Sequence, residues 1–273
     1  MLSRRALVTA ALALVARPTW ATEPASSAAP DIKRILDRGR LIVAIAGFEV
    51  PFFVTGTADD KPAGHDIALA QGMAASLGVA VEFDHRAQSF DGILDIVARY
   101  EADLAVSRLS VTLPRALRVR FSHPYLVLHQ ALLLNRPRLA SLAQGREPLA
   151  VVNAPDTDIA VVEGTGYADY AKGLLPQARL ALYPQWEPDI VDAVLRGDVL
   201  GAFADELAVN GTLAARPAAA LQLRSLVLAE SRDPIAVALP WDSVQLAAWV
   251  DLYLDSVAPL TIDALQAPNG KRE

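Results

Sequence analysis

The segment SRLSVTLPR, residues 107–115, is the most informative stretch of this chain, because it follows a short apolar strand candidate at residues 103–106. Ligands gather at the carboxyl ends of strands in open α/β sheets. Thr112 is placed to cap the turn that follows, and Arg115 then directs a rigid fork of donors back toward the strand end. With the hydroxyl of Ser110, this fork predicts a carboxylate clamp. An arginine that bridges a surface acid is the open alternative.

The pattern on both sides of this segment predicts two α/β units. Short β-branched runs alternate with stretches of helical period, and this rhythm is typical of a largely parallel sheet with helices on its faces. In the first unit the strands are expected at residues 41–45, 79–83 and 103–106, and the helices at 66–77 and 90–100. In the second unit the strands are expected at 159–162, 179–183 and 199–203, and the helices at 167–174 and 189–196.

Three further segments complete the predicted outline. Residues 126–134 are apolar and long enough for an extended crossover between the units. Near the end, residues 234–239 predict a strand and residues 241–257 an amphipathic helix. These last two elements have no partner in the second unit. A return to the first unit is possible, but periodicity alone leaves it open.

Composition excludes several classes of protein. The chain has 273 residues, 53% hydrophobic and 21% charged, which excludes disorder and fits one and a half to two domains. A formal charge of −6 makes nucleic acid an unsuitable partner, because phosphate binding needs clustered bases. Cysteine is absent from the sequence, which excludes disulfides, thiolate zinc sites and a lipidated amino-terminal cysteine.

The first residues predict export. Two arginines at positions 4 and 5 precede an apolar run at 6–16 and a small residue, Ala21, which is the order of a secretory signal peptide over residues 1–21. The apolar run is too short to span a bilayer. Residues 22–30 are expected to be a flexible tether. We therefore expect a protein free in the periplasm, with a formal charge of −9 after loss of three arginines.

Neither a metal nor a cofactor is expected. The four histidines, at positions 65, 85, 123 and 129, show no ligand spacing, and there is no HExxH, GxSxG, P-loop or GxGxxG motif. The tripeptide Gly164-Thr165-Gly166 follows a strand and opens a helix. It therefore offers a weak site for a carboxylate or phosphate.

An ordered set of short motifs makes the chain similar to a known family. In order they are LDRGRLIV (36–43), PF (51–52), GHDIALA (64–70), ADL (102–104), SVTLPR (110–115) with FSHPY (121–125), EGTG (163–166) and AFADE (202–206). Over residues 31–249 the sequence resembles the family-3 extracellular solute-binding proteins, the periplasmic amino-acid-binding proteins of ABC importers.

The resemblance implies the two-lobed type II periplasmic-binding fold. Each lobe would be a mainly parallel α/β sheet flanked by helices, and two strands, near residues 126–134 and 221–228, would form a hinge. Lobe 1 would comprise residues 31–127 and 226–265, lobe 2 residues 128–225, and residues 266–273 a tail. The ligand would bind between the lobes.

The resemblance also assigns roles to individual residues. Arg115 matches the arginine that holds a ligand α-carboxylate, beside Ser110, and Thr165 matches a second-lobe donor to the same group. Asp205 matches the acid that receives the α-ammonium group, and Phe90 matches a residue that flanks the ligand side chain. Arg115 and Ser110 would bind first, and closure would then bring Thr165 and Asp205 to the ligand.

Three positions depart from the family pattern, and two others could compensate for one of them. Glu49 stands where an aromatic residue commonly stacks on the ligand, and Phe48 or Phe52 could replace that aromatic wall. Arg108 stands at a position of small residues. Gly166 replaces a second hydroxyl of the carboxylate clamp. Glu49 and Phe52 are therefore also candidate ligand-binding residues.

The expected function is therefore binding rather than catalysis. A monomeric receptor would capture an amino acid or a related zwitterion and deliver it to an ABC permease of the inner membrane. One alternative is an enzyme similar to the cyclohexadienyl dehydratases, for which Glu163, Glu49 and His65 are the candidate acids. Another is a solute sensor that docks on a membrane receptor.

Overall fold

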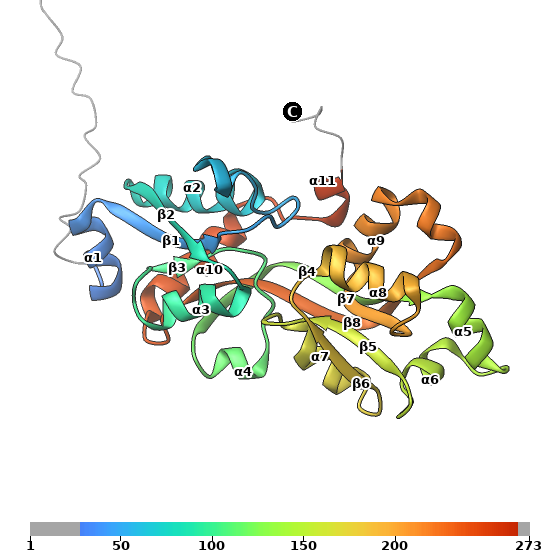
Figure 1. Cartoon of the computed structure of the whole chain (residues 1–273). Helices are drawn as coiled ribbons and strands as arrows, with labels where there is room; N and C mark the ends of the chain where they lie inside the picture. The colour runs from blue at the N-terminus through green and yellow to red at the C-terminus, as the bar shows by residue number, and fades with distance from the viewer. Residues whose placement is uncertain (1–27, 267–273) are drawn as a thin grey trace, which may run out of the picture.

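The computed structural model describes residues 28–266, so the predicted signal segment and most of the tether lie outside the described residues. Its strands form one sheet of eight strands in the order β2-β1-β3-β8-β4-β7-β5-β6 (Figure 1). They are β1 (Arg40–Ala46), β2 (Ala80–Ala87), β3 (Leu104–Ala105), β4 (Arg120–Asn135), β5 (Asp158–Val162), β6 (Arg179–Tyr183), β7 (Gly201–Asp205) and β8 (Leu223–Leu239).

Strand direction divides the sheet into two parallel parts joined by two antiparallel strands. β1 pairs in parallel with β2 and β3, and β5 pairs in parallel with β6 and β7. The long strands β4 and β8 pair antiparallel with each other, and their outer edges pair antiparallel with β7 and β3. The α/β class and the mainly parallel sheets expected from the alternating pattern are confirmed.

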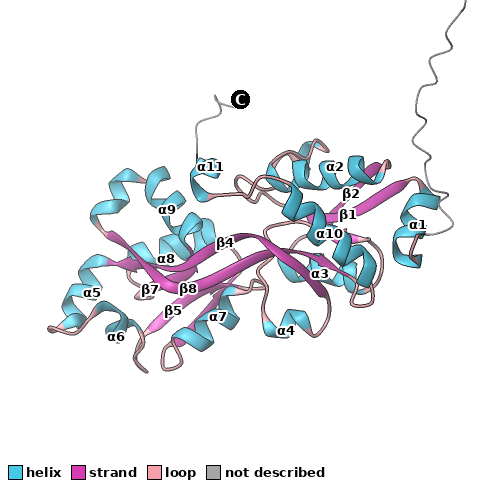
Figure 2. Cartoon of the chain, turned by 180° about the vertical axis from the view of Figure 1, so that it is seen from behind, coloured by secondary structure: helices cyan, strands magenta, loops and turns pink. Residues whose placement is uncertain are grey.

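Helices connect the strands and cover both halves of the sheet (Figure 2). Those of the first half are α1 (Pro30–Arg38), the 3₁₀ helix η2 (Thr57–Asp59), α2 (His65–Leu77), α3 (Phe90–Ala98), α4 (Leu113–Ala116), α10 (Val244–Ser256) and α11 (Ile262–Gln266). Those of the second half are α5 (Arg136–Ala143), α6 (Pro148–Val152), α7 (Tyr167–Leu174), the π helix η3 (Trp186–Ile190), α8 (Val191–Arg196), α9 (Glu206–Ala215) and the 3₁₀ helix η4 (Pro217–Leu221). Within the described residues, we find no helix with the length and apolarity that a membrane crossing requires.

Buried apolar side chains form two separate clusters, which define the two lobes. We call the half around the first cluster lobe 1; it includes β1, α2, α3 and the Ile235–Leu239 end of β8. We call the half around the second cluster lobe 2; it includes β5, α8 and β7. β4 contributes to both, since Leu128 packs in the first cluster and Leu132 in the second. Both β4 and β8 pass from one lobe to the other (Figure 2).

The carboxyl-terminal elements return to lobe 1, which periodicity had left open. Leu246 and Val250 of α10 are buried in the first cluster. The predicted helix at 241–257 begins three residues late because Asp31 Oδ2 accepts the backbone N–H groups of Gln245 at 3.0 Å and Leu246 at 2.9 Å. This carboxylate caps a helix start that no nearby residue caps.

Strands β4 and β8 are longer than the sequence pattern predicts. The apolar run 126–134 is the second half of β4, which already begins at Arg120 and so includes the FSHPY segment. The expected crossover near 221–228 and the expected strand 234–239 are one strand, β8, of 17 residues. The β4–β8 pairing shifts register between Phe121 and Pro124, between Pro124 and Leu126, and between Leu128 and Gln130.

Candidate functional site

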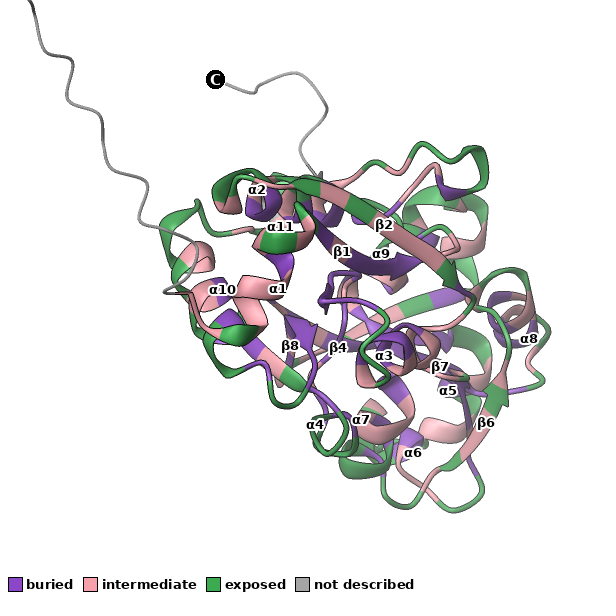
Figure 3. Ribbon diagram, turned by 90° about the vertical axis from the view of Figure 1, so that its left-hand side faces the viewer, coloured by how far each residue is buried: buried purple, intermediate pink, exposed green. Residues whose placement is uncertain are grey.

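The loop after β3 brings the SRLSVTLPR segment to the junction of the lobes. Val111 N donates to Pro234 O at 2.9 Å, which fastens the loop to β8. Thr112 Oγ1 accepts the Arg115 N–H at 3.4 Å and caps α4, as the sequence predicts. β1, which leads to the same region, is buried at nearly every position (Figure 3). The segment is therefore fastened beside a buried part of lobe 1.

Arg115 is buried at this junction, with only 5% of its side chain exposed. Its Nε and Nη2 donate to Asp91 Oδ1 at 3.1 and 2.8 Å, and its Nη1 donates to Ser110 O at 3.1 Å. Nη2 also reaches Gly164 O of lobe 2, at 3.4 Å. The guanidinium therefore holds a carboxylate of its own chain and joins the two lobes. Its predicted contact with a ligand carboxylate stays a prediction.

Asp205 lies on the lobe 2 side and is 1% exposed. Its Oδ1 accepts the Ala208 N–H at 2.9 Å and caps α9. Its Oδ2 accepts the hydroxyl of Tyr167 at 2.5 Å and pairs with Arg108 Nη1 at 3.2 Å. Both carboxylate oxygens of Asp205 thus contact groups of the protein itself. Asp205, the predicted acceptor of a ligand ammonium group, is therefore paired with Arg108 of the same chain.

Arg108 reaches this acid from lobe 1 between aromatic rings. Its Cζ lies 5.8 Å from the centroid of Phe53 and 5.9 Å from that of Phe90, and its Nη2 donates to Tyr167 Oη at 3.3 Å. Phe90 also packs edge-on against Phe48, with centroids 5.2 Å apart. The rings beside Arg108 are thus Phe53 and Phe90, and the predicted contact of Phe48 or Phe52 with a ligand stays a prediction.

Two candidate residues from the sequence lie apart from these contacts. Phe52 is 43% exposed with a φ of 72°, so the next residue, Phe53, is the one turned into the core. Glu49 is exposed and its Oε1 accepts the Gly56 N–H at 2.9 Å, which fixes its own turn. The structure does not bring either residue to Arg115 or Asp205. Both residues lie in an irregular loop, where neighbouring side chains point in opposite directions. A prediction that is one position off therefore selects the outward-facing residue.

Thr165 lies at the amino-terminal end of α7, opposite Arg115. Its hydroxyl donates to Val162 O at 2.7 Å and accepts the Tyr167 N–H at 3.3 Å. Thr165 lines a cavity of about 330 Å³ together with Asp91 of lobe 1 and seven other residues of lobe 2, namely Glu163, Gly164, Ala168, Asp169, Lys172, Leu180 and Leu182. A Cβ added at the neighbouring Gly166 would lie 3.1 Å from Ser110 Cβ, so the two lobes touch here.

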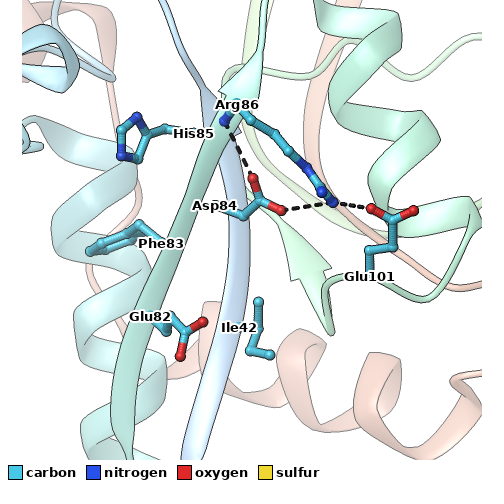
Figure 4. A pocket seen from close by; sticks show the side chains of 7 residues that line it. All are labelled: Ile42, Glu82, Phe83, Asp84, His85, Arg86 and Glu101. Carbon is cyan, nitrogen blue, oxygen red and sulfur yellow. Dashed lines mark hydrogen bonds and ion pairs between the residues drawn. The ribbon is translucent and has the colours of Figure 1, made fainter.

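A second, larger hollow of about 610 Å³ lies away from the junction (Figure 4). It is lined by side chains of β1, β2 and the loop after α3, namely Ile42, Glu82, Phe83, Asp84, His85, Arg86 and Glu101. Arg86 pairs with both Asp84 and Glu101 and so neutralises part of the negative charge that lines this hollow. The buried, convergent polar groups are at the lobe junction, and we place the candidate site there. Among the described residues, no group of His, Asp and Glu side chains is arranged to hold a metal ion.

Sequence reasoning missed a layer of buried acids behind Arg108. Asp66 is fully buried and accepts the Arg108 N–H at 2.6 Å and the Tyr125 hydroxyl at 2.9 Å. Burial raises the pKa of Asp66 to about 6, against the lowering effect of these two hydrogen bonds. The motif GHDIALA marks the family, but helical periodicity alone does not show that Asp66, in the first turn of its helix, faces inward.

Asp233 of β8 is the second missed acid. It is fully buried, and Ser110 Oγ lies 3.2 Å from its Oδ2. Its Oδ1 and both polar side-chain atoms of Gln130 make no hydrogen bond within the described residues. Burial, with the nearby Asp205 carboxylate, raises the pKa of Asp233 to about 7. In the sequence, the only sign that Asp233 is buried is its place directly before the apolar run 234–239.

The raised pKa of Asp233 predicts a pH-dependent stability. Between about pH 4 and pH 7 the folded chain keeps a proton on Asp233 that the unfolded chain has lost, so stability falls as the pH rises through this interval. Relative to the Asp233→Asn variant, the wild type should lose about 2 kcal/mol of unfolding free energy between pH 5 and pH 7. Urea unfolding at several pH values measures this difference. Ser110→Ala, which keeps the carboxyl group, should retain the slope; a constant difference between wild type and Asp233→Asn would contradict the prediction.

Comparison with known protein families gives a match over most of the chain. The model of the family described as bacterial extracellular solute-binding proteins, family 3, matches residues 41–265. Two curated relatives match shorter stretches. The membrane-bound lytic murein transglycosylase F of Maricaulis maris is 31% identical over 166 residues, 60% of this chain and 34% of the relative. The probable ABC transporter extracellular-binding protein YckB of Bacillus subtilis is 32% identical over 95 residues, 34% of this chain and 32% of the relative. These matches span about a third of each relative's length.

Solved structures match the fold more completely. The ancestral amino acid-binding protein AncCDT-1, a precursor of cyclohexadienyl dehydratase, has a TM-score of 0.65 at 26% identity, over 82% of this chain and 91% of the other. The amino acid ABC transporter substrate-binding protein AbpA of Streptococcus pneumoniae, bound to L-arginine, has a TM-score of 0.63 at 27% identity, over 82% and 90%. A putative ABC transporter binding component of Wolinella succinogenes, complexed with lysine, has a TM-score of 0.65 at 25% identity, over 80% and 89%.

Proposed function

Because the chain belongs to family 3 of the bacterial extracellular solute-binding proteins, we propose that it captures an amino acid or a related small zwitterion between its lobes and delivers it to an ABC importer. The observation that carries the proposal is the buried guanidinium of Arg115, which lies at the lobe junction and already binds one carboxylate. A buried arginine fork with two donors on one carboxylate oxygen has the chemistry needed for a ligand α-carboxylate.

The other predicted site residues supply the rest of the clamp. Ser110 and Thr165 stand on opposite lobes near Arg115, and Asp205 is the acid for the ammonium pole. An ammonium group that reaches Asp205 has to share its carboxylate with Arg108 and Tyr167. The open Oδ1 of Asp233 is a further acceptor nearby. Phe90 bounds the space for the ligand side chain.

Closure of the lobes is the signal that an importer would recognise. We propose that β4 and β8 are the hinge and that the lobe boundaries are those predicted, 31–127 with 226–265 and 128–225. Arg115 and Ser110 bind the solute first from lobe 1, and the loop with Gly164 and Thr165 then closes over it. Bound solute favours the closed arrangement because it contacts both lobes only there. The permease partner, the periplasmic location and the monomeric state belong to the same proposal.

A thermal-shift panel tests the receptor function. The panel holds the common amino acids, short mono- and dicarboxylates, and amines without a carboxylate. A solute bound at about 1 μM and supplied at 1 mM stabilises the fold by about 4 kcal/mol, which raises the melting temperature by roughly 10 °C. We expect such a shift only with solutes that carry a carboxylate. If calorimetry finds binding of amines alone, or of no solute in the panel, the proposal is wrong.

A turnover assay separates the receptor from the enzyme alternative. An acid catalyst has to point into the site, and of the candidate acids only Glu163 lines the cavity at the junction. Incubation with prephenate and arogenate, followed by product analysis, is expected to give no turnover. Turnover that is lost in Glu163→Gln would establish the enzyme instead.

A further inference from the structure

Two buried side chains at the lobe junction have polar atoms without hydrogen-bond partners. Asp233 lies on β8 and Gln130 on β4, and both are fully buried. Within the described residues, Asp233 Oδ1, Gln130 Oε1 and Gln130 Nε2 make no hydrogen bond. A buried polar atom without a partner costs free energy, and packing alone does not account for three of them in one place.

The sheet brings these two side chains beside Asp205. β4 lies between β8 and β7, and Gln130 is the register partner of Asp205 on β7. On the other edge of β4, Asp233 is the register partner of Leu128, two residues before Gln130. Leu128 packs in lobe 1 and Leu132 in lobe 2, so this is the point where β4 passes between the lobes. The three polar side chains therefore gather on the strands that join the lobes.

The buried acids at this point outnumber the cations that face them. Asp66, Asp205 and Asp233 all act on the guanidinium of Arg108, which is the cation they share. Arg108 pairs with Asp205 through its side chain and with Asp66 through its backbone N–H. Asp233 has the hydroxyl of Ser110 as its partner, at 3.2 Å, rather than a cation. A buried carboxylate is unfavourable without a compensating positive charge, and Asp233 lacks one.

We propose that Asp233 and Gln130 form the subsite for the ammonium pole of the solute, and that the ammonium group supplies the positive charge that this acid lacks. The inference rests on the proposed function and deepens it, because it names the acid that takes the ammonium group while Asp205 is shared with Arg108. An ammonium group donates to several acceptors at once. Asp233 Oδ1 and Gln130 Oε1 are two acceptors without a donor.

Ser110 places this subsite next to the arginine proposed for the carboxylate pole. The carbonyl of Ser110 accepts Arg115 Nη1 at 3.1 Å, and its hydroxyl donates to Asp233 Oδ2 at 3.2 Å. In an α-amino acid, one carbon atom separates the carboxylate from the ammonium group. A guanidinium and a buried acid on the two sides of a single residue match a molecule of that size.

Opening of the lobes gives a solute access to this subsite. The groups that interact with Asp233 come from both lobes, Arg108 from lobe 1 and Tyr170 from lobe 2. Tyr170 Oη donates to Val111 O at 2.7 Å, and Arg108 pairs with Asp205 across the junction. Both groups are thus held by contacts between the lobes. Separation of the lobes breaks these contacts and uncovers the two strands beneath them.

Binding of an ammonium group at Asp233 releases a proton. Burial and the Asp205 carboxylate raise the pKa of Asp233 to about 7, so this acid holds a proton at lower pH. The pairing with Arg108 lowers this pKa, and the facing phenols of Tyr167 and Tyr170 stay neutral because their own pKa values are raised. A bound ammonium group favours the ionised carboxylate and expels the proton. Amino-acid affinity therefore rises with pH, by up to about 10-fold per unit, and levels off above about pH 7.

Calorimetry with paired probes tests the subsite. The probes are the common amino acids, each paired with the carboxylate that has its carbon skeleton but no amino group, as L-glutamate is paired with glutarate and L-alanine with propionate. Asp233→Asn resembles the protonated acid and should fold. At pH 7.5 it should bind the amino acid at least about 10-fold more weakly, the effect of one hydrogen bond to a charged group, and bind the paired carboxylate as the wild type does.

Two further variants make this result specific. Gln130→Leu removes the unpartnered amide and keeps a buried side chain of similar size. It should weaken amino-acid binding less than Asp233→Asn does, and it should keep the proton release. Asp95→Asn removes an exposed acid that pairs with Arg118, and should behave as the wild type with every probe.

Titration in buffers of different ionisation enthalpy counts the protons. At pH 6 the wild type should release about one proton more per bound amino acid than Asp233→Asn, since only the wild type has the titrating acid. Asp66, with a pKa of about 6, is present in both proteins, so the difference between them reports Asp233 alone.

Each outcome decides the inference. Equal proton release by the two proteins overturns it, and so does an unchanged amino-acid affinity in Asp233→Asn, which would mean that these buried atoms bind water alone. An equal loss for an amino acid and its paired carboxylate also overturns it, because Asp233 would then act on the fold rather than on the ammonium group. In these cases the wild type still binds solute and the proposed function stands. If the wild type binds none of the probes, both fail.

Discussion

Arg115→Ala is expected to abolish solute binding, with an affinity loss of at least 100-fold. The guanidinium is 5% exposed and has the donors that a ligand carboxylate needs, and each hydrogen bond to a charged group contributes about 1.5–3 kcal/mol. Two such bonds together exceed the free energy of a 100-fold change in affinity. Calorimetry with the solute identified by the thermal-shift panel measures the loss.

Two further variants make the Arg115 result specific. Arg115→Lys keeps the positive charge but loses the planar fork, so an intermediate loss is expected. Arg118→Ala, three residues further along, removes an exposed arginine and should leave the affinity unchanged. Because Arg115 also contacts Ser110 O and Gly164 O, the unfolding temperature of Arg115→Ala is measured without solute. A well-folded Arg115→Ala protein with full affinity would refute the assigned role.

Asp205→Asn is expected to lower the free energy of unfolding by about 3–5 kcal/mol. Removal of one partner from a buried pair leaves the other charge uncompensated, and here that charge is Arg108. Asparagine caps a helix about as well as aspartate, so the start of α9 should survive the change. The loss is therefore assigned to the ion pair rather than to the cap. Urea unfolding without solute measures it.

A double-mutant cycle and a matched acid test this assignment. Arg108→Gly removes the stranded charge, so the double variant with Asp205→Asn should recover a large part of the lost stability. Asp95→Asn is the matched control, because Asp95 pairs with Arg118 and both side chains of that pair are exposed. Its cost should be at most about 1 kcal/mol. Equal costs for the two asparagine variants, or no recovery in the double variant, would show that the pair does not stabilise the junction.

Features that depend on neighbours along the chain were predictable from the sequence. The alternation of β-branched runs and helical stretches predicts the parallel parts of the sheet, since side-chain period follows from local backbone geometry. Thr112 caps α4 because the groups that bond are three residues apart. The family follows from short motifs in a fixed order. The same motifs pointed to Arg115, Thr165 and Asp205 without their partners, and the ligand contacts of these residues stay predictions.

Features that depend on residues far apart in the chain required the tertiary structure. Packing within lobe 1 brings Asp91 to Arg115, and the packing of one lobe on the other brings Arg108 to Asp205. Asp31 caps α10 from the opposite end of the chain. Asp66 and Asp233 are buried by strands and loops that no local pattern connects to them.

The sequence by itself determined the α/β class, the family and the arginine fork at a strand end, because these rest on local geometry and on residue types in order. Only the tertiary structure decided that Phe53 rather than Phe52 faces inward and that Arg108 pairs with Asp205. The physical reason is that Coulomb attraction and burial act between atoms close in space, whatever their separation along the chain.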